Sequence, residues 1–156
     1  MRTLLLTSFL LLFSACSIKN YEHTQSKIFI IKSPAFKFAD LGYLRNTGDA
    51  LELDLFIAGN LVKHIEINRM ICVDEGCLSK ASFNEEYLYK AYPSDTLQSI
   101  LLGKPIYGGK NIFKKANGFE QSIKTNEVDI RYRVDSHTIF FKDSKNKIIF
   151  KIKETL

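Results

Sequence analysis

The chain has 156 residues, of which 46% are hydrophobic and 25% charged, a composition typical of a globular protein rather than a disordered one. Its formal net charge of +5 favours contact with anionic surfaces such as lipid headgroups. No predicted helix concentrates lysine and arginine on one face, and the N-terminus indicates export, so we expect no nucleic-acid partner.

The N-terminus has the pattern of an export signal. Arg2 is followed by an apolar run over residues 4–13, which is too short for a membrane-spanning helix because such a helix needs about 20 residues. Small residues at 14–15 then precede Cys16, as expected of a cleavage site. This pattern resembles a bacterial lipoprotein signal, which implies that Cys16 becomes the acylated first residue and contacts membrane lipid. An ordinary secretory signal with an incidental cysteine is the alternative.

The expected organisation is a signal peptide at 1–15, a lipid anchor and polar tether at 16–26, and a single domain at 27–156. About 140 residues remain after signal removal, which is enough for one hydrophobic core and too few for two domains. Ser17 follows the anchor cysteine, whereas lipoproteins retained at the inner membrane of enteric bacteria have an aspartate there. By that resemblance we expect a lipid-anchored protein of the outer membrane that faces the periplasm.

Two further cysteines, Cys72 and Cys77, are separated by four residues. In an exported protein such a pair is well placed to close a small disulfide loop. A metal site normally needs four ligands, and no second cysteine or histidine pair is nearby. The spacing also differs from the two-residue form of common redox motifs. We therefore favour a structural disulfide over a metal clip or a redox dithiol.

From Lys27 onward the pattern predicts β-strands. The clearest signal is the alternation of apolar and polar residues over 51–57, which is the period of a half-buried strand. Gly59 and Asn60 then turn the chain and the alternation returns, which predicts a hairpin. Four strands are expected in this part of the domain, at residues 28–31, 36–38, 51–57 and 61–68.

The middle of the chain changes to a helical pattern. Ser82 and Glu85 match the capping box that begins a helix, which we expect to continue to about Ala91. A second short helix is expected to carry Leu97 and Leu101 on one side.

The last third of the chain is again β, with strands expected at 119–124, 128–134, 139–141 and 147–152. Short connections make these strands antiparallel. The expected fold class is therefore mainly β (α+β): a curved antiparallel sheet, or unclosed half-barrel, of about eight strands with two short helices inserted in the middle.

The sequence offers little for catalysis, and we expect no enzyme, no catalytic residue, no cofactor and no metal. His23, His64 and His137 lie in the tether, on the polar face of a strand and in a turn. None has a cysteine, serine or carboxylate at a spacing that suggests catalysis. Residues 108–110 are too short for a phosphate-binding loop and lack its strand-to-helix context.

Aromatic residues are plentiful, with 12 Phe and 7 Tyr. In a small antiparallel sheet they imply a broad aromatic and aliphatic concave face. Two interpretations stay open: the helices and the curvature of the sheet cover both faces, or a partly closed barrel keeps an apolar pocket on its inner face.

The order of elements resembles LolB-like proteins, the outer-membrane receptors of the lipoprotein-localisation pathway, which are lipoproteins with an unclosed antiparallel half-barrel. Residues 51–61 look like that family's hairpin, in which a strand continues into an apolar, glycine-containing loop. Residues 93–105 are similar to its second helix, and residues 119–152 match its closing strands in number and order.

This resemblance implies an outer-membrane lipoprotein that binds acyl chains or lipoproteins in an apolar cavity and aids their membrane insertion, with a periplasmic lipoprotein carrier as a partner. The hairpin tip, with Ile57, Ala58 and Leu61, would contact the membrane. Alternatively, Ile57 and Leu61 close the core at the strand end. The side chains that would contact acyl chains, or equally form the core, are Leu53, Leu55, Ile65, Leu97, Leu101, Val128, Ile130 and Phe141.

A second hypothesis is a non-catalytic surface lipoprotein that acts as an adhesin or accessory interaction module. Such a module would pair a sheet face or an edge strand with a partner protein. A filled concave face would favour it.

Overall fold

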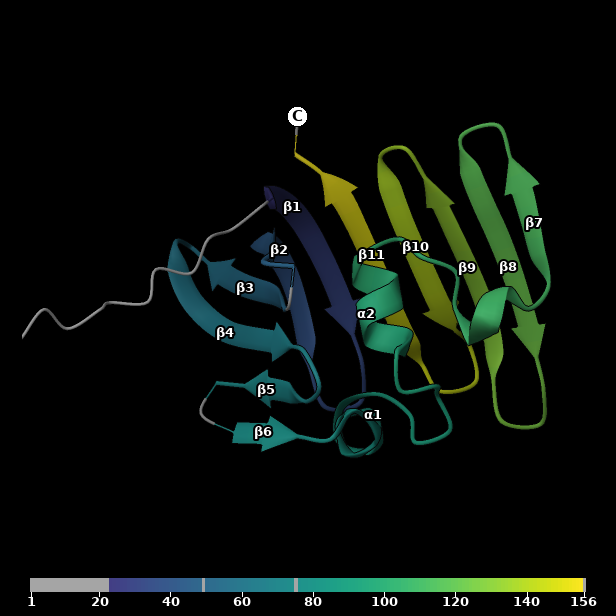
Figure 1. The fold of residues 1–156 in the computed structure, drawn as a ribbon, viewed down its shortest axis with the longest axis horizontal. Coiled ribbons are helices and arrows are strands. Elements are labelled where there is room, and N and C mark those ends of the chain that lie inside the picture. The colour runs from purple at the N-terminus through teal and green to yellow at the C-terminus, as the bar shows by residue number, and fades with distance from the viewer. Residues whose placement is uncertain (1–22, 49, 75, 156) are drawn as a thin grey trace, which may run out of the picture.

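The computed structural model of the protein describes residues 23–48, 50–74 and 76–155. Within these ranges eleven antiparallel strands form one unclosed sheet, with the helices inserted between the sixth and seventh strands (Figure 1). This confirms the predicted fold class. The predicted signal at 1–15 and the lipidation site Cys16 lie outside the described residues.

The first arm of the sheet precedes the helices in sequence. Each of its strands pairs antiparallel with the next, and β6 forms one edge of the sheet. The strands are β1 (His23–Lys32), β2 (Lys37–Asn46), β3 (Leu51–Ile57), β4 (Asn60–Ile67), β5 (Ile71–Val73) and β6 (Gly76–Leu78).

The second arm follows the helices and ends at the opposite edge, β7. Its last strand, β11, pairs with β1, where Ile31 lies opposite Phe150, so the two arms are joined through the first and last strands. The strands are β7 (Ile112–Lys115), β8 (Gly118–Lys124), β9 (Asp129–Asp135), β10 (Thr138–Asp143) and β11 (Ile148–Glu154).

The structure contains three strands that the sequence pattern did not predict: β5, β6 and β7. β5 and β6 have three residues each, too few to show a period of two, and all four residues of β7 are exposed. β1 also begins at His23, so residues 23–26, assigned above to the tether, instead pair with β2. These residues are polar because they are largely exposed.

Helix α1 (Lys80–Tyr87) begins earlier than predicted. Its N-cap is Ser79, whose hydroxyl oxygen accepts a hydrogen bond of 3.0 Å from the backbone N–H of Ser82. Ser82 therefore lies within the first turn, and the predicted capping box with Glu85 is wrong. The helix also ends at Tyr87, before the predicted Ala91.

Helix α2 (Thr96–Leu101) is the predicted second helix, and a 3-10 turn, η1 (Tyr107–Gly109), follows it. Three buried polar side chains of the second arm attach the helical segment and its loops, from Tyr92 to η1, to the sheet. Tyr132 donates its hydroxyl proton to the Lys104 carbonyl at 3.0 Å, and the Gln121 amide bonds both backbone groups of Ile106. Asp143 accepts a hydrogen bond of 2.7 Å from the Tyr92 hydroxyl.

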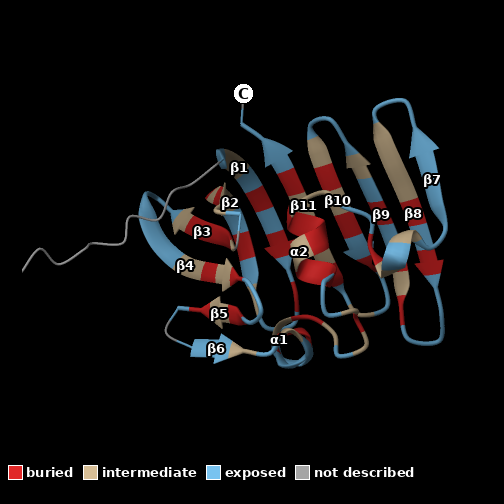
Figure 2. Cartoon of the chain, viewed as in Figure 1, coloured by how far each residue is buried: buried red, intermediate tan, exposed pale blue. Residues whose placement is uncertain are grey.

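The core lies between the helices and the concave face of the sheet. Buried residues alternate with half-buried or exposed ones along β1, β9, β10 and β11, as the red bands between tan or pale blue ones in Figure 2 show. Phe141 is completely buried, and its ring packs edge-on against Tyr92, Tyr132 and Phe150 at centroid distances of 5.9–6.1 Å. Side chains from both arms and both helices therefore share one core.

The predicted disulfide is present at the edge of the first arm. Cys72 in β5 lies directly opposite Cys77 in β6, and an S–S bond of 2.04 Å joins them. The bridge therefore connects the outermost pair of strands.

Candidate functional site

A small apolar cavity of about 40 Å³ lies beneath α1. Phe83 and Tyr87 of α1 form one wall, and Leu97 of α2 forms another. Leu53 and Ile65, from the concave face of the first arm, lie across from them. The cavity is therefore lined by both helices and the sheet.

Polar groups near the cavity have partners outside it. The hydroxyl of Ser33 bonds the backbone of Phe36, and the ammonium of Lys63 donates to Asp74 Oδ2 at 2.6 Å. Only the aliphatic stem of Lys63 is therefore available to the cavity. Burial and the neighbouring Glu86 carboxylate raise the pKa of Tyr87, so its phenol stays neutral. An apolar ligand suits such a site.

The eight predicted acyl-chain residues are at most 7% exposed. Leu53, Ile65 and Leu97 line the cavity, whereas Leu55, Leu101, Val128, Ile130 and Phe141 pack into the surrounding core. Ligand pockets are typically about 300–1,000 Å³, so a cavity of about 40 Å³ does not hold an acyl chain in this conformation. The helices thus cover the concave face, which is the first of the two interpretations given above, and leave only a small cavity there.

The hairpin that joins β3 to β4 (Figure 1) ends in an exposed apolar tip. Ile57 is 49% and Leu61 54% exposed, so the interpretation that they close the core is wrong. Ala58 and Gly59 form the turn with φ values of 50° and 83°, as two-residue hairpins require. Val62, which sequence reasoning missed, adds a third apolar side chain at 41% exposure because a bulge shifts the register here.

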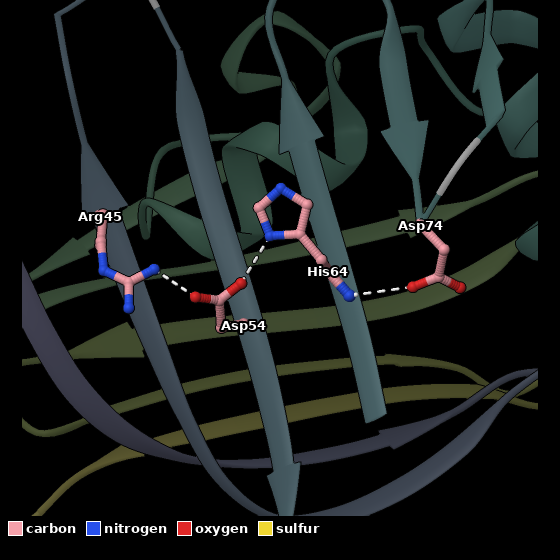
Figure 3. A network of polar contacts seen from close by, with 4 residues as sticks. All are labelled: Arg45, Asp54, His64 and Asp74. Atoms are coloured by element: carbon pink, nitrogen blue, oxygen red, sulfur yellow. Dashed lines mark hydrogen bonds and ion pairs between the residues drawn. The ribbon is translucent and has the colours of Figure 1, made fainter. Parts of the chain in front are cut away.

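A polar network that the sequence pattern does not predict joins three strands and the turn after β5 on the convex side of the first arm (Figure 3). Asp54 of β3 forms an ion pair with Arg45 of β2, and its Oδ1 is hydrogen-bonded to Nδ1 of His64 in β4 at 2.6 Å. The backbone N–H of His64 donates to Asp74 Oδ1, beyond β5, at 3.2 Å. The spacing of His64 along the sequence does not reveal this carboxylate partner, because Asp54 lies on the neighbouring strand.

The network is well suited to a structural role. Burial alone would raise the pKa of Asp54, but the hydrogen bonds from His64 and Arg45 outweigh it, so this pKa lies below its usual value. The carboxylate is therefore charged at neutral pH, with each of its oxygens bonded to a neighbouring strand. These contacts hold β2, β3 and β4 in register. The predicted hairpin brings these two strands together, but only the bulge between Leu55 and Phe56 sets the register that places Asp54 opposite His64.

Among the described residues, no three histidine, cysteine or acidic side chains come together to hold a metal ion. Within the same part of the chain, no helix has the length and apolar character needed to cross a membrane.

Comparisons with known proteins do not assign the chain to a family. No protein-family model, curated protein or solved structure matches it. The similarity to LolB-like proteins thus stays a prediction based on the motifs quoted above.

Proposed function

We propose that this protein is a non-enzymatic outer-membrane lipoprotein that binds acyl chains beneath α1 and releases them into the membrane. The observation that carries the proposal is the apolar cavity between α1 and the concave face of the first arm. Acylation of Cys16 would keep this site next to the bilayer, and the similarity to LolB-like proteins points to lipoprotein acyl chains as the cargo and a periplasmic carrier as its source.

Binding requires α1 to move, because the cavity is far smaller than an acyl chain. α1 is suited to this movement, since Phe83 and Asn84 are its only buried residues. Asn84 bonds the carbonyls of Tyr92 and Pro93 in the following loop and contacts no strand through hydrogen bonds. α2 and η1, in contrast, are hydrogen-bonded to the second arm through Tyr132 and Gln121. An acyl chain would therefore replace the Phe83 ring while α2 stays in place.

Replacing Phe83 with alanine tests this arrangement. The change enlarges the cavity and removes the main contact of α1 with the sheet, so we expect several-fold stronger binding of a fluorescent long-chain fatty acid to the purified full chain. Phe119→Ala is the matched control, because Phe119 is half-buried in the second arm, away from the cavity. The absence of binding by both the wild type and the folded Phe83→Ala variant would contradict the proposal.

The hairpin tip is the proposed membrane contact. Ile57→Ser together with Leu61→Ser should slow fatty-acid release to vesicles at least tenfold, since each apolar side chain contributes about 1.5–3 kcal/mol when buried. Fatty-acid affinity should stay unchanged, because neither residue lines the cavity. Met70→Ser, which removes a 43% exposed apolar side chain outside the tip, is the control. Equal release rates for the three proteins would show that the tip has no part in release.

The interaction module is the second candidate, and the edge strand β7 favours it. All four residues of β7 are exposed, and Phe113 is 66% exposed at the free edge of the sheet. An unpaired edge of this kind can add a strand from a partner protein. This candidate predicts that neither the wild type nor Phe83→Ala carries an acyl chain.

A further inference from the structure

The face of the sheet opposite the helices is strongly basic. Along the strands of the second arm and its junction with the first, buried residues alternate with side chains that point to this convex side. Cationic side chains outnumber the acidic ones, such as Asp129 and Asp135, on this side of the sheet. We call the following seven the convex basic face: Lys32, Lys37, Arg131, Arg133, Lys142, Lys151 and Lys153.

The strand register brings these charges together. Arg131 lies directly opposite Lys142, and Lys32 lies directly opposite Lys37. Like charges in opposite positions of neighbouring strands destabilise a sheet. None of the seven forms a salt bridge with another described residue. Glu120 lies directly opposite Arg133, but its carboxylate is paired with the ammonium of Lys115 at 2.6 Å. The face therefore carries charge repulsion that a bound anion would relieve.

A groove of about 470 Å³ lies at one end of this face. Arg131 and Arg133 contribute to its lining together with Phe113 and Phe140, and the Arg133 guanidinium lies 5.9 Å from the centre of the Phe140 ring. A planar guanidinium is well suited to bind phosphate with two hydrogen bonds. The groove thus combines phosphate-binding groups with aromatic surface.

Aliphatic side chains are interspersed with the cations. Ile28 and Ile30 of β1 are 41% and 38% exposed on the same side of the sheet. Cations mixed with exposed apolar side chains fit the interface of an anionic bilayer, where phosphates lie above acyl chains. The predicted anchor at Cys16 also lies only seven residues before His23, a reach of at most about 25 Å. β1, which carries Ile28 and Ile30, would thus stay close to lipid.

We propose that the convex basic face binds the phosphate headgroups of anionic lipids and docks the second arm on a membrane surface. This goes beyond the acyl-chain function and does not depend on it, because the cavity under α1 is on the other side of the sheet. Charge complementarity and the exposed isoleucines favour lipid over an acidic protein as the occupant.

The test compares the full chain with a variant that combines Arg131→Gln, Arg133→Gln and Lys142→Gln. Binding to phosphatidylcholine vesicles is measured by co-sedimentation, with and without phosphatidylglycerol. We expect the wild type to prefer the anionic vesicles, and the triple variant to lose affinity for them on the order of 100-fold, since each cation near an anionic surface contributes about fivefold. High salt should remove the difference. Any binding through residues 1–15 is common to all proteins compared and cancels.

The matched control removes the same charge outside the convex basic face, with Lys90→Gln, Lys104→Gln and Lys110→Gln, which are all exposed and do not line the groove. We expect the affinity of this control for anionic vesicles to change less than threefold, because binding depends on where the cations lie and not on net charge alone. The first triple variant should also unfold at a higher temperature than the wild type without lipid, because repulsion is relieved. Its fatty-acid binding should be unchanged, which separates this proposal from the previous one.

Inorganic phosphate and a soluble short-chain phosphatidylglycerol distinguish the sources of the anion. We expect the short-chain lipid to bind more tightly than phosphate, because its glycerol and acyl groups contact the aromatic part of the groove. Equal affinity for the two would overturn membrane docking in favour of a free-anion site. Equal losses of vesicle affinity in the two triple variants would overturn the proposal as well. So would vesicle binding that is unchanged in the variant with Arg131→Gln, Arg133→Gln and Lys142→Gln.

Discussion

Replacing Phe141 with alanine should lower the free energy of unfolding by about 3–5 kcal/mol, the usual cost of removing a buried phenylalanine. The side chain is 0% exposed and touches aromatic rings from three directions. One of these rings, Tyr92, belongs to the loop between the helices, and another, Phe150, belongs to the strand that joins the two arms. The cavity would therefore open where the helical layer and both arms meet.

Urea denaturation followed by circular dichroism measures this loss. Phe113→Ala is the control, because Phe113 is 66% exposed on β7 and its removal should change the unfolding free energy by less than about 0.5 kcal/mol. If the two substitutions had similar effects, the aromatic cluster around Phe141 would not be the centre of the core.

Replacing Asp143 with asparagine should cost about 3 kcal/mol at neutral pH, because charge-assisted hydrogen bonds contribute about 1.5–3 kcal/mol each. Asp143 is 0% exposed. Its carboxylate accepts hydrogen bonds from the Tyr92 hydroxyl at 2.7 Å, the Asn146 amide at 2.7 Å and the backbone N–H of Asp129 at 3.1 Å. An amide group would turn its own N–H towards one of these donors.

The cost should depend on pH. Burial alone would raise the pKa of Asp143, but the hydrogen bonds from Asn146, Tyr92 and Asp129 outweigh it and lower this pKa below its ordinary value of 3.8. A lowered pKa in the folded state adds stability above the ordinary value, and this stability is lost as the pH falls through the folded pKa. The difference in unfolding free energy between the wild type and Asp143→Asn should therefore be constant above about pH 5 and shrink below about pH 4.

Denaturant titrations over this pH range measure the difference. Asp95→Asn is the control, since Asp95 is exposed and makes no side-chain capping bond, and its effect should be small at every pH. A double-mutant cycle with Tyr92→Phe isolates the buried hydrogen bond. A difference in unfolding free energy between the wild type and Asp143→Asn that stays the same from neutral pH to pH 3 would contradict the assignment of this stability to the Asp143 carboxylate.

Much of the fold follows from periodicity, because strands that are buried on one side must alternate. The alternation over 51–57 and 61–68 predicts β3 and β4, which the structure confirms. The turn lies one residue earlier than predicted, at Ala58 and Gly59, so that Asn60 already belongs to β4. β5 and β6 escape this reasoning because three residues do not establish a period, and β7 escapes it because no side of it is buried. The capping box at Ser82 has the right spacing, but the backbone N–H of Ser82 is already bonded to Ser79.

The candidate site is less predictable, since alternation assigns a residue to a face and says nothing about what covers that face. Leu53 and Phe141 point inward as predicted, and only the packing of the helices decides that Leu53 lines a small cavity whereas Phe141 lies in the closed core. The alternation over 51–57 predicts a solvent-facing Asp54, but this residue is 8% exposed because Arg45 and His64 cover it from adjacent strands. Such a cluster depends on register across three strands, which no single segment reveals.

The pairing of β1 with β11 has a consequence for how the molecule assembles. Within each arm, neighbouring strands are joined by short turns, so their pairing is local and is expected to form quickly. The joint between the arms instead brings together the two ends of the domain, such as Ile31 and Phe150. Until β11 pairs with it, β1 has no partner strand on one side, so the first arm keeps an open edge. Closing this joint is thus expected to be the slow step of folding, and the period before it is when the partly folded protein most needs protection from aggregation.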